Sequence, residues 1–272
     1  MNKIALLFLL FLASCSEAVP ENAIILVSTT STQDSGLLDV LLPAFTQQTG
    51  YQVSLIATGS GQALKIAEQG NADVILLHSP QAELKFMQEG FGVDRRPVMH
   101  NDFVIVGPSA DPASIRAQPT ALAAFEGIFA SASTFVSRGD ESGTHVKEMS
   151  LWDQAGLDPV RKDWYLETGQ GQGATLSIAS EKQGYALTDR GTFLAYRSNV
   201  NLVILFEGDP ILLNVYHVIT VNPEIWPHVN LMGAQTFADF VTSSEGQRII
   251  REYGVAEYGQ PLFIPDAGSE SP

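Results

Sequence analysis

Short continuous apolar runs recur along the first third of the chain, and each is followed by a segment with apolar residues at helical spacing. The runs at 23–27, 52–57 and 72–78 predict buried strands. The segments after them predict amphipathic helices, for which Gly70 and Gly90 are suitable C-terminal stops. Because strands and helices alternate at this spacing, the pattern indicates a parallel sheet with helices on both faces.

A change of composition after Gly107 indicates that the chain crosses into a second domain, beginning with Pro108 and a polar segment. Further strands are predicted at 101–107, 134–136, 164–167, 185–188, 202–206 and 211–221, and further helices at 121–129, 142–156, 176–182, 235–242 and 245–253. The last apolar run is long enough to lead back to the first domain. We therefore predict one lobe from residues 24–106 plus 216–264 and a second lobe from residues 107–215.

The N-terminus has the pattern of an export signal. Lys3 precedes an apolar run at 4–12 that is too short to span a bilayer. The sequence that follows, ending in Cys15, resembles the bacterial lipobox, which predicts a signal peptide at 1–15, a lipid on Cys15 and a tether at 16–23. A plain secretory signal is the alternative. Cys15 is the only cysteine, which excludes a disulfide framework and a cysteine metal site. Residues 265–272 are predicted to form a disordered tail.

Hydroxyl and glycine residues gather where four predicted strands give way to helices. A helix start presents free backbone N–H groups and the positive end of the helix dipole, which suits an anion. The same residue types are also ordinary helix caps, and one junction alone does not separate the two interpretations. In an open α/β sheet, ligands lie beyond the carboxyl ends of the strands. We therefore predict one anion site in a cleft between the lobes, formed by the junctions at 29–32, 58–61, 142–144 and 169–175.

The net charge restricts both the partners and the kind of anion site. It is -15, which argues against a nucleic-acid partner and against attraction to an anionic membrane. An anion site must therefore consist of local hydrogen-bond donors and one cation. Arg138 suits that role because its planar guanidinium can bind two oxygens at once. Arg190 is either a second cation or the partner of an acid such as Asp189. Asp140 and Glu141 are expected to hold the loop and face away from the anion.

Ser142 and His145 could be compared with a nucleophile and its base. They lie on one predicted helix start, however, whereas a serine triad assembles residues from distant segments. Their spacing from Asp140 and Glu141 matches no metal-binding motif, and no lysine follows the glycines near Gly169 as in a nucleotide-binding loop. We expect no enzyme activity, no cofactor and no metal, and we expect His145 either to orient the loop or simply to be exposed. An exported hydrolase that uses Ser142 or His145 is the alternative.

An ordered set of motifs resembles the tungstate-binding proteins of bacterial ABC importers. The similarity extends over about residues 24–253 and rests on Ser28-Thr29-Thr30-Ser31-Thr32, Thr58-Gly59-Ser60-Gly61, Asn101-Asp102-Phe103-Val104, Ser137-Arg138-Gly139-Asp140-Glu141-Ser142-Gly143-Thr144-His145, Glu167-Thr168-Gly169-Gln170-Gly171 and Leu187-Thr188-Asp189-Arg190-Gly191-Thr192. The resemblance implies an α/β fold of the two-lobed periplasmic-binding-protein type (type II). In that fold two mixed sheets are flanked by helices and joined by two hinge strands.

The resemblance also implies the residues that hold the anion. They would be Thr30, Ser31, Ser60, Arg138, Ser142, Gly143, Thr144 and Thr175. Ser60 stands where the family has threonine, and Glu141 stands where it has a second aspartate. Both departures preserve the chemistry, and they leave the choice among tetrahedral oxyanions open. The Ser-Gly-Thr sequence after an acidic residue is also similar to that of phosphate-binding proteins.

The function implied is that of an extracytoplasmic, monomeric solute-binding lipoprotein, periplasmic or at the cell surface. It would capture tungstate between its lobes and deliver it to an ABC importer, formed by a permease and its ATPase, with the lipid on Cys15 as its membrane attachment. The ligand would be held by hydrogen bonds alone. Molybdate, vanadate or phosphate in the same role is an alternative, and so is a ligand-sensing domain that docks on a signalling receptor.

Overall fold

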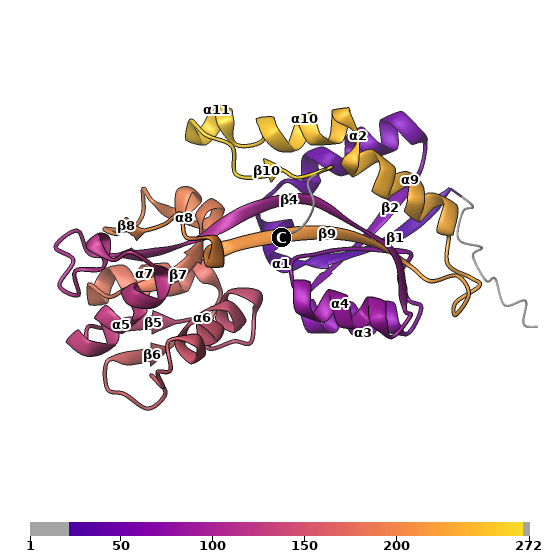
Figure 1. The fold of residues 1–272 in the computed structure, drawn as a ribbon. Coiled ribbons are helices and arrows are strands. Elements are labelled where there is room, and N and C mark those ends of the chain that lie inside the picture. Colours follow the sequence, from indigo (N-terminus) through magenta and orange to yellow (C-terminus); the bar gives the residue numbers. More distant parts are fainter. Residues whose placement is uncertain (1–21, 269–272) are drawn as a thin grey trace, which may run out of the picture.

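A computed structural model describes residues 22–268 of the chain. Two lobes are connected by two long strands, β4 (Gly92–Gly107) and β9 (Leu213–Val221), which run across the middle of the molecule (Figure 1). Lobe I contains both ends of the described chain, and lobe II contains its middle. The predicted signal peptide, Cys15 and most of the tether lie outside the described residues. The described helices include none that is long and apolar enough to cross a membrane.

The sheet of lobe I contains β1 (Ala23–Thr29), β2 (Gln52–Thr58), β3 (Val74–Leu77) and β10 (Ile264–Pro265), together with β4 and β9. Their order is β10-β4-β9-β3-β1-β2. β1, β2 and β3 are parallel, because each crossover between them passes through a helix. β9 is antiparallel to β3 and to β4. The parallel arrangement predicted for the first three strands is therefore confirmed. β9 enters lobe I from lobe II and runs antiparallel to β3, so the sheet is mixed, as the family resemblance implies.

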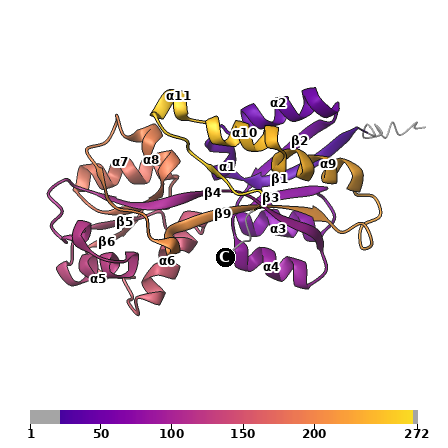
Figure 2. The ribbon, with the colours of Figure 1, turned by 45° about the horizontal axis from the view of Figure 1, so that its top comes forward.

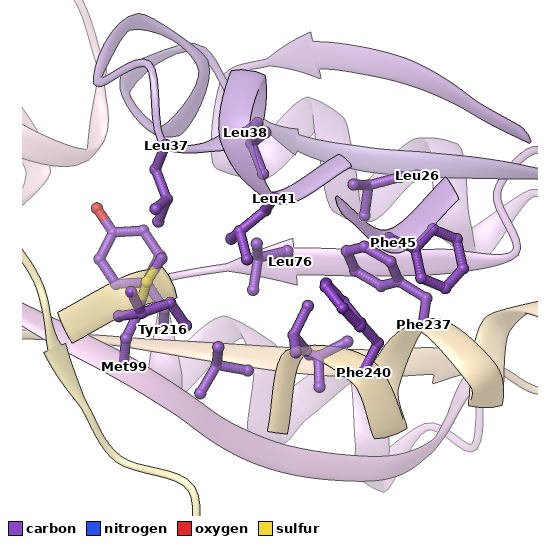
Figure 3. Packing of buried hydrophobic residues seen from close by; sticks show 14 of the residues in the cluster. Leu26, Leu37, Leu38, Leu41, Phe45, Leu76, Met99, Tyr216, Phe237 and Phe240 are labelled. Carbon is purple, nitrogen blue, oxygen red and sulfur yellow. The ribbon is translucent and has the colours of Figure 1, made fainter. Parts of the chain in front are cut away.

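Helices cover both faces of this sheet, as predicted. One face is covered by α2 (Leu38–Thr49), α9 (Leu231–Thr242) and α10 (Ser244–Glu252), and the other by α3 (Ser60–Glu68) and α4 (Pro80–Gln88) (Figures 1 and 2). In the first layer, Phe45 is fully buried, and its ring meets Phe237 edge-on at 5.2 Å (Figure 3). Burying one such side chain contributes roughly 2–3 kcal/mol. This packing holds α2 and α9 together on one face of the sheet.

Lobe II has two strand groups within a shell of helices. β7 (Ala186–Asp189) and β8 (Val203–Phe206) pair antiparallel with the last residues of β4, whereas β5 (Phe135–Ser137) and β6 (Tyr165–Glu167) form a separate parallel pair. The helical elements are α5 (Ala121–Ser131), α6 (Gly143–Gln154), α7 (Gln172–Lys182), α8 (Arg190–Tyr196), and the 3-10 turns η1 (Ile115–Ala117) and η2 (Pro210–Leu212). Trp152 of α6 is fully buried, with its ring 4.4 Å from that of Phe125. The C-terminal end of α6 is therefore anchored in the lobe II core.

Each cluster of buried hydrophobic side chains belongs to one lobe, with one exception. Leu194 of α8, a lobe II helix, packs in a cluster with lobe I residues such as Leu262. The C-terminal segment, with α11 (Val255–Tyr258), lies where the lobes meet in both overall views (Figures 1 and 2). This segment therefore connects the lobes on one side of the hinge strands.

Two segments have local order that the sequence pattern did not specify. After β1, Thr29 caps a short helix, α1 (Thr30–Asp34), by accepting a hydrogen bond from the Thr32 N–H. The predicted tail at 265–272 is ordered at its start. Pro265 pairs with β4, and the Asp266 carboxylate accepts a hydrogen bond from His100 Nδ1 at 2.8 Å. Residues 269–272 lie outside the described chain.

Candidate oxyanion site

Strand register brings the four hydroxyl-rich junctions together in pairs. In lobe I, Thr29 lies opposite Thr58 at the ends of the parallel strands β1 and β2. In lobe II, Ser137 lies opposite Glu167 at the ends of β5 and β6, and the Gly169 N–H donates to the Arg138 carbonyl at 2.8 Å. Each lobe therefore presents two junctions at one edge, as expected for the carboxyl ends of parallel strands.

Residues from both lobes line one cavity of about 370 Å³. Lobe I contributes Thr30 and Ser31 from the start of α1, and lobe II contributes Arg138. The start of α7 adds residues 171–174, among them the buried Gln172. Three of the eight predicted ligands, Thr30, Ser31 and Arg138, are therefore brought to one cavity.

The other five predicted residues do not line this cavity. Gly143 lies beside His78, as described below, and Ser142 and Thr144 flank it at the start of α6. Ser60 lies at the start of α3, and its Oγ is buried without a hydrogen-bond partner among the described residues. Thr175 is fully buried, and its hydroxyl already meets the Gly171 carbonyl at 3.2 Å and Thr168 Oγ1 at 3.0 Å. The ligand roles of all eight residues stay predictions.

The Arg138 guanidinium is held by its own loop. Its Nε and Nη2 both donate to Asp140 Oδ2, at 3.0 and 2.5 Å. The other carboxylate oxygen of Asp140 accepts the Ser142 N–H at 3.1 Å. Burial opposes ionisation of Asp140, but the hydrogen bonds from Ser142 and Arg138 outweigh it and lower the pKa of this carboxyl. Asp140 thus holds the loop, as expected, and it does so by contacting the cation directly.

The turn before α6 depends on two residues with positive φ. Gly139 has φ of 59°, and a Cβ there would lie 2.8 Å from Glu167 Cβ, so only glycine fits. Glu141 has φ of 59° and donates its N–H to His145 Nδ1 at 3.0 Å. Ser142 caps α6 by accepting the His145 N–H at 3.4 Å. His145 therefore orients the loop, as predicted, and its Nδ1 is engaged by a backbone N–H instead of by a hydroxyl nucleophile.

His78, which sequence reasoning did not select, contacts Ser31 of the cavity and its neighbour Thr29. It follows β3, is buried, and its Nε2 lies 3.1 Å from Thr29 Oγ1 and 3.2 Å from Ser31 Oγ. Its Cε1 would be 3.0 Å from a Cβ on Gly143, the first residue of α6. One side chain thus touches the hydroxyls of lobe I and the helix start of lobe II. The apolar run that contains His78 gave no signal of this position.

Arg190 is not the cation of this cavity. Its guanidinium donates to Asp102 at 2.7 and 2.6 Å and to Glu207 at 2.5 Å. The interpretation of Arg190 as the partner of an acid is therefore the one that the structure favours, but the acid is not Asp189. Asp189 instead caps α8 by accepting from the Thr192 N–H at 2.8 Å. Among residues 22–268, no group of three His, Cys, Asp or Glu side chains is arranged to hold a metal ion.

Comparisons with known proteins show the family to which this fold belongs. A family model described as a PBP superfamily domain matches residues 16–245. The chain is 44% identical over 249 residues to the tungstate-binding protein TupA of Peptoclostridium acidaminophilum, across 91% of this chain and 87% of that protein. The solved tungstate-binding protein TupA of Desulfovibrio alaskensis G20 matches with a TM-score of 0.83 at 44% identity, covering 90% of this chain and 99% of that one. A structure described as the tungstate ABC transporter from Geobacter sulfurreducens matches with a TM-score of 0.75 at 49% identity, covering 86% and 99%.

Proposed function

Since this chain belongs to the PBP superfamily and, within it, to the tungstate-binding proteins of ABC transporters, we propose that it captures tungstate between its lobes. The observation that carries the proposal is the shared cavity, where Thr30 and Ser31 of lobe I meet Arg138 of lobe II. A tetrahedral dianion needs many donors and one cation in such a cleft. The proposal extends to the other predicted ligands, Ser60, Ser142, Gly143, Thr144 and Thr175.

Delivery to a permease follows from the two-lobed construction. An anion that bonds to both lobes stabilises the closed arrangement, because only that arrangement satisfies all of its oxygens. The closed form would then be recognised by the permease of the importer. We propose that the protein acts outside the cytoplasm as a monomer, attached to the membrane through a lipid on Cys15.

The geometry supports binding rather than catalysis. A serine nucleophile needs a base within hydrogen-bond reach of its hydroxyl. Ser142 Oγ instead accepts the backbone N–H of His145, and the His145 ring accepts the backbone N–H of Glu141. This arrangement supports a binding loop, so we propose no enzyme activity and no cofactor.

Isothermal titration of the purified mature protein with tungstate, molybdate, vanadate, sulfate and phosphate tests the proposal. Tungstate and molybdate are expected to bind well, and the smaller sulfate and phosphate poorly. Preferential binding of phosphate would shift the assignment to the phosphate-binding alternative. No binding of any oxyanion would refute the proposed function.

A further inference from the structure

We propose that His78 is a positioning residue of the anion site, which holds the lobe I hydroxyls and the start of α6 in register and changes its protonation when the anion binds. The inference rests on the proposed function and assigns a role to a residue that is not among the predicted ligands. It is carried by five contacts of one imidazole, which come from β9, from the end of β1, from the start of α1 and from the start of α6.

The tautomer of His78 follows from its partner on β9. His78 Nδ1 lies 2.8 Å from Asn214 Oδ1. The Asn214 Nδ2 donates to Asn101 Oδ1 at 2.7 Å and to the Tyr216 hydroxyl at 3.2 Å, which fixes the amide so that its oxygen faces the imidazole. Nδ1 therefore carries the proton, and in the neutral ring Nε2 is an acceptor.

Nε2 faces a cluster of hydroxyl groups that hydrogen-bond to one another, so only a few arrangements of their protons satisfy all of the contacts. Thr29 Oγ1 contacts Thr32 Oγ1 at 2.6 Å, Ser31 Oγ at 3.0 Å and Nε2 at 3.1 Å. It also accepts the Thr32 N–H. The Nε2 of a neutral imidazole accepts one hydrogen bond, from the hydroxyl of Thr29 or Ser31, since it has one free lone pair. Protonation turns Nε2 into a donor, which makes these oxygens acceptors and leaves the Ser31 proton free to face the cavity.

The Cε1 corner of the ring, between its two nitrogens, contacts lobe II. Gly143 approaches so closely that a Cβ would lie 3.0 Å from His78 Cε1. The Tyr216 ring supports the imidazole, with centroids 4.7 Å apart. Contacts with β9, including Tyr216, hold the ring in place, so the ring sets the distance between the Ser31 hydroxyl and the N–H groups at the start of α6. Donors from two lobes can bind the same anion only if the distance between them is fixed in this way.

The surroundings make this histidine sensitive to added charge. Burial lowers the pKa of His78, while the Asn214 hydrogen bond and the carboxylates of Glu83 on α4 and Asp189 at the end of β7 act in the opposite direction. Its contacts on α1, α6 and β9 are Ser31, Gly143, Asn214 and Tyr216, none of which carries a charge near pH 7. The ring is therefore neutral at pH 7, and a dianion placed beside Ser31 raises its pKa. Binding then takes up protons, and affinity increases as the pH falls through the pKa of the bound form.

The experiment is calorimetric titration of the mature chain with micromolar tungstate between pH 6 and 8, in two buffers of different ionisation enthalpy. Such pairs of buffers count the protons taken up on binding. The variants are His78→Asn and His78→Gln, with His228→Gln as control, because His228 bonds the Gly70 carbonyl far from the cavity. Asparagine retains a donor for Asn214 but does not reach Ser31, whereas the glutamine amide can occupy the place of Nε2.

Wild type and His228→Gln are expected to take up protons increasingly toward pH 6. His78→Asn should bind at least about tenfold more weakly, as for one lost hydrogen bond. His78→Gln should recover most of the affinity but show no pH-dependent uptake. If His78→Asn does not fold, as judged by thermal unfolding, the proton count of His78→Gln still decides. Wild-type affinity and proton uptake in both variants would overturn the inference alone, and a wild type that binds no oxyanion would overturn it together with the proposed function.

Discussion

The guanidinium of Arg138 and the carboxylate of Asp140 form an ion pair within the loop that lines the cavity, and both side chains are largely shielded from water. The same carboxylate accepts the Ser142 N–H, so one side chain fixes the cation and the start of α6 together. The negative charge of Asp140 next to the proposed anion site therefore has a structural role. Asp140 positions two hydrogen-bond donors, although its carboxylate also repels an anionic ligand.

Asp140→Ala and Asp140→Asn separate these two effects. Alanine removes both contacts, so we expect about tenfold weaker tungstate binding, since Arg138 and the α6 start are no longer held in place. Asparagine keeps an acceptor for the Ser142 N–H and removes the repelling charge, so its affinity should lie above that of alanine. Calorimetry on both variants measures the order. Equal affinities in the two variants would show that Asp140 does not hold the loop.

Ser60 offers a test with two readouts of opposite sign. Its buried Oγ has no partner among the described residues, and such a group weakens the free protein, by roughly 1 kcal/mol or more. Ser60→Ala should therefore leave the free energy of unfolding unchanged or raise it, while tungstate affinity falls. Ser177→Ala is the control, because Ser177 is exposed on α7 and bonds the Gly173 carbonyl. Denaturant unfolding and calorimetry give the two readouts, and unaltered affinity would remove Ser60 from the ligand set.

The buried carboxyl of Glu148 leads us to predict how the stability of lobe II depends on pH. Burial raises the pKa of this carboxyl to about 7, although it accepts hydrogen bonds from Tyr165 and Trp152. The raised pKa means that the folded state favours the protonated acid. Its contribution to stability is therefore complete below a pH of about 4.5 and is lost as the pH rises through about 7.

We accordingly expect the free energy of unfolding to fall between pH 5 and 8, with a share on the order of 3 kcal/mol from this group. Glu148→Gln should flatten that part of the profile, because the amide oxygen can still accept both hydrogen bonds. The exposed Glu181→Gln is the control. Urea unfolding at several pH values measures the slopes, and an identical slope in Glu148→Gln would contradict the assignment.

The strand-to-helix junctions could be predicted because their signal is local. Hydroxyls and glycines at 29–32 and 137–144 adjoin recognisable strands, and parallel strands place their ends together whatever the rest of the chain does. The role of His145 was also predictable, because it contacts the backbone only four residues away. Contacts between residues close in sequence form in any fold that contains the strand and the helix on either side of them.

Other features depended on contacts between distant segments. His78 is fixed by Asn214, 136 residues away, and Arg190 is paired with Asp102, 88 residues away. The order at Asp266 comes from His100 on the hinge strand β4. Hydrophobic periodicity carries no information on such pairs, because each residue alone is compatible with several partners. The alternation of strands and helices did not reveal the antiparallel strand of the mixed sheet for the same reason, since the direction of β9 is set by lobe II.

The central claim is that the cavity between the lobes holds tungstate through the cation Arg138. Calorimetric titration of Arg138→Ala with tungstate tests it most directly, with Arg197→Ala as a control that removes the same charge from an exposed position of lobe II. We expect Arg197→Ala to bind as the wild type does. Arg138→Ala should still fold but lose at least about a hundredfold in affinity, because a charged hydrogen-bond donor is lost and Asp140 is left unpaired. Wild-type affinity in a folded Arg138→Ala would contradict the account.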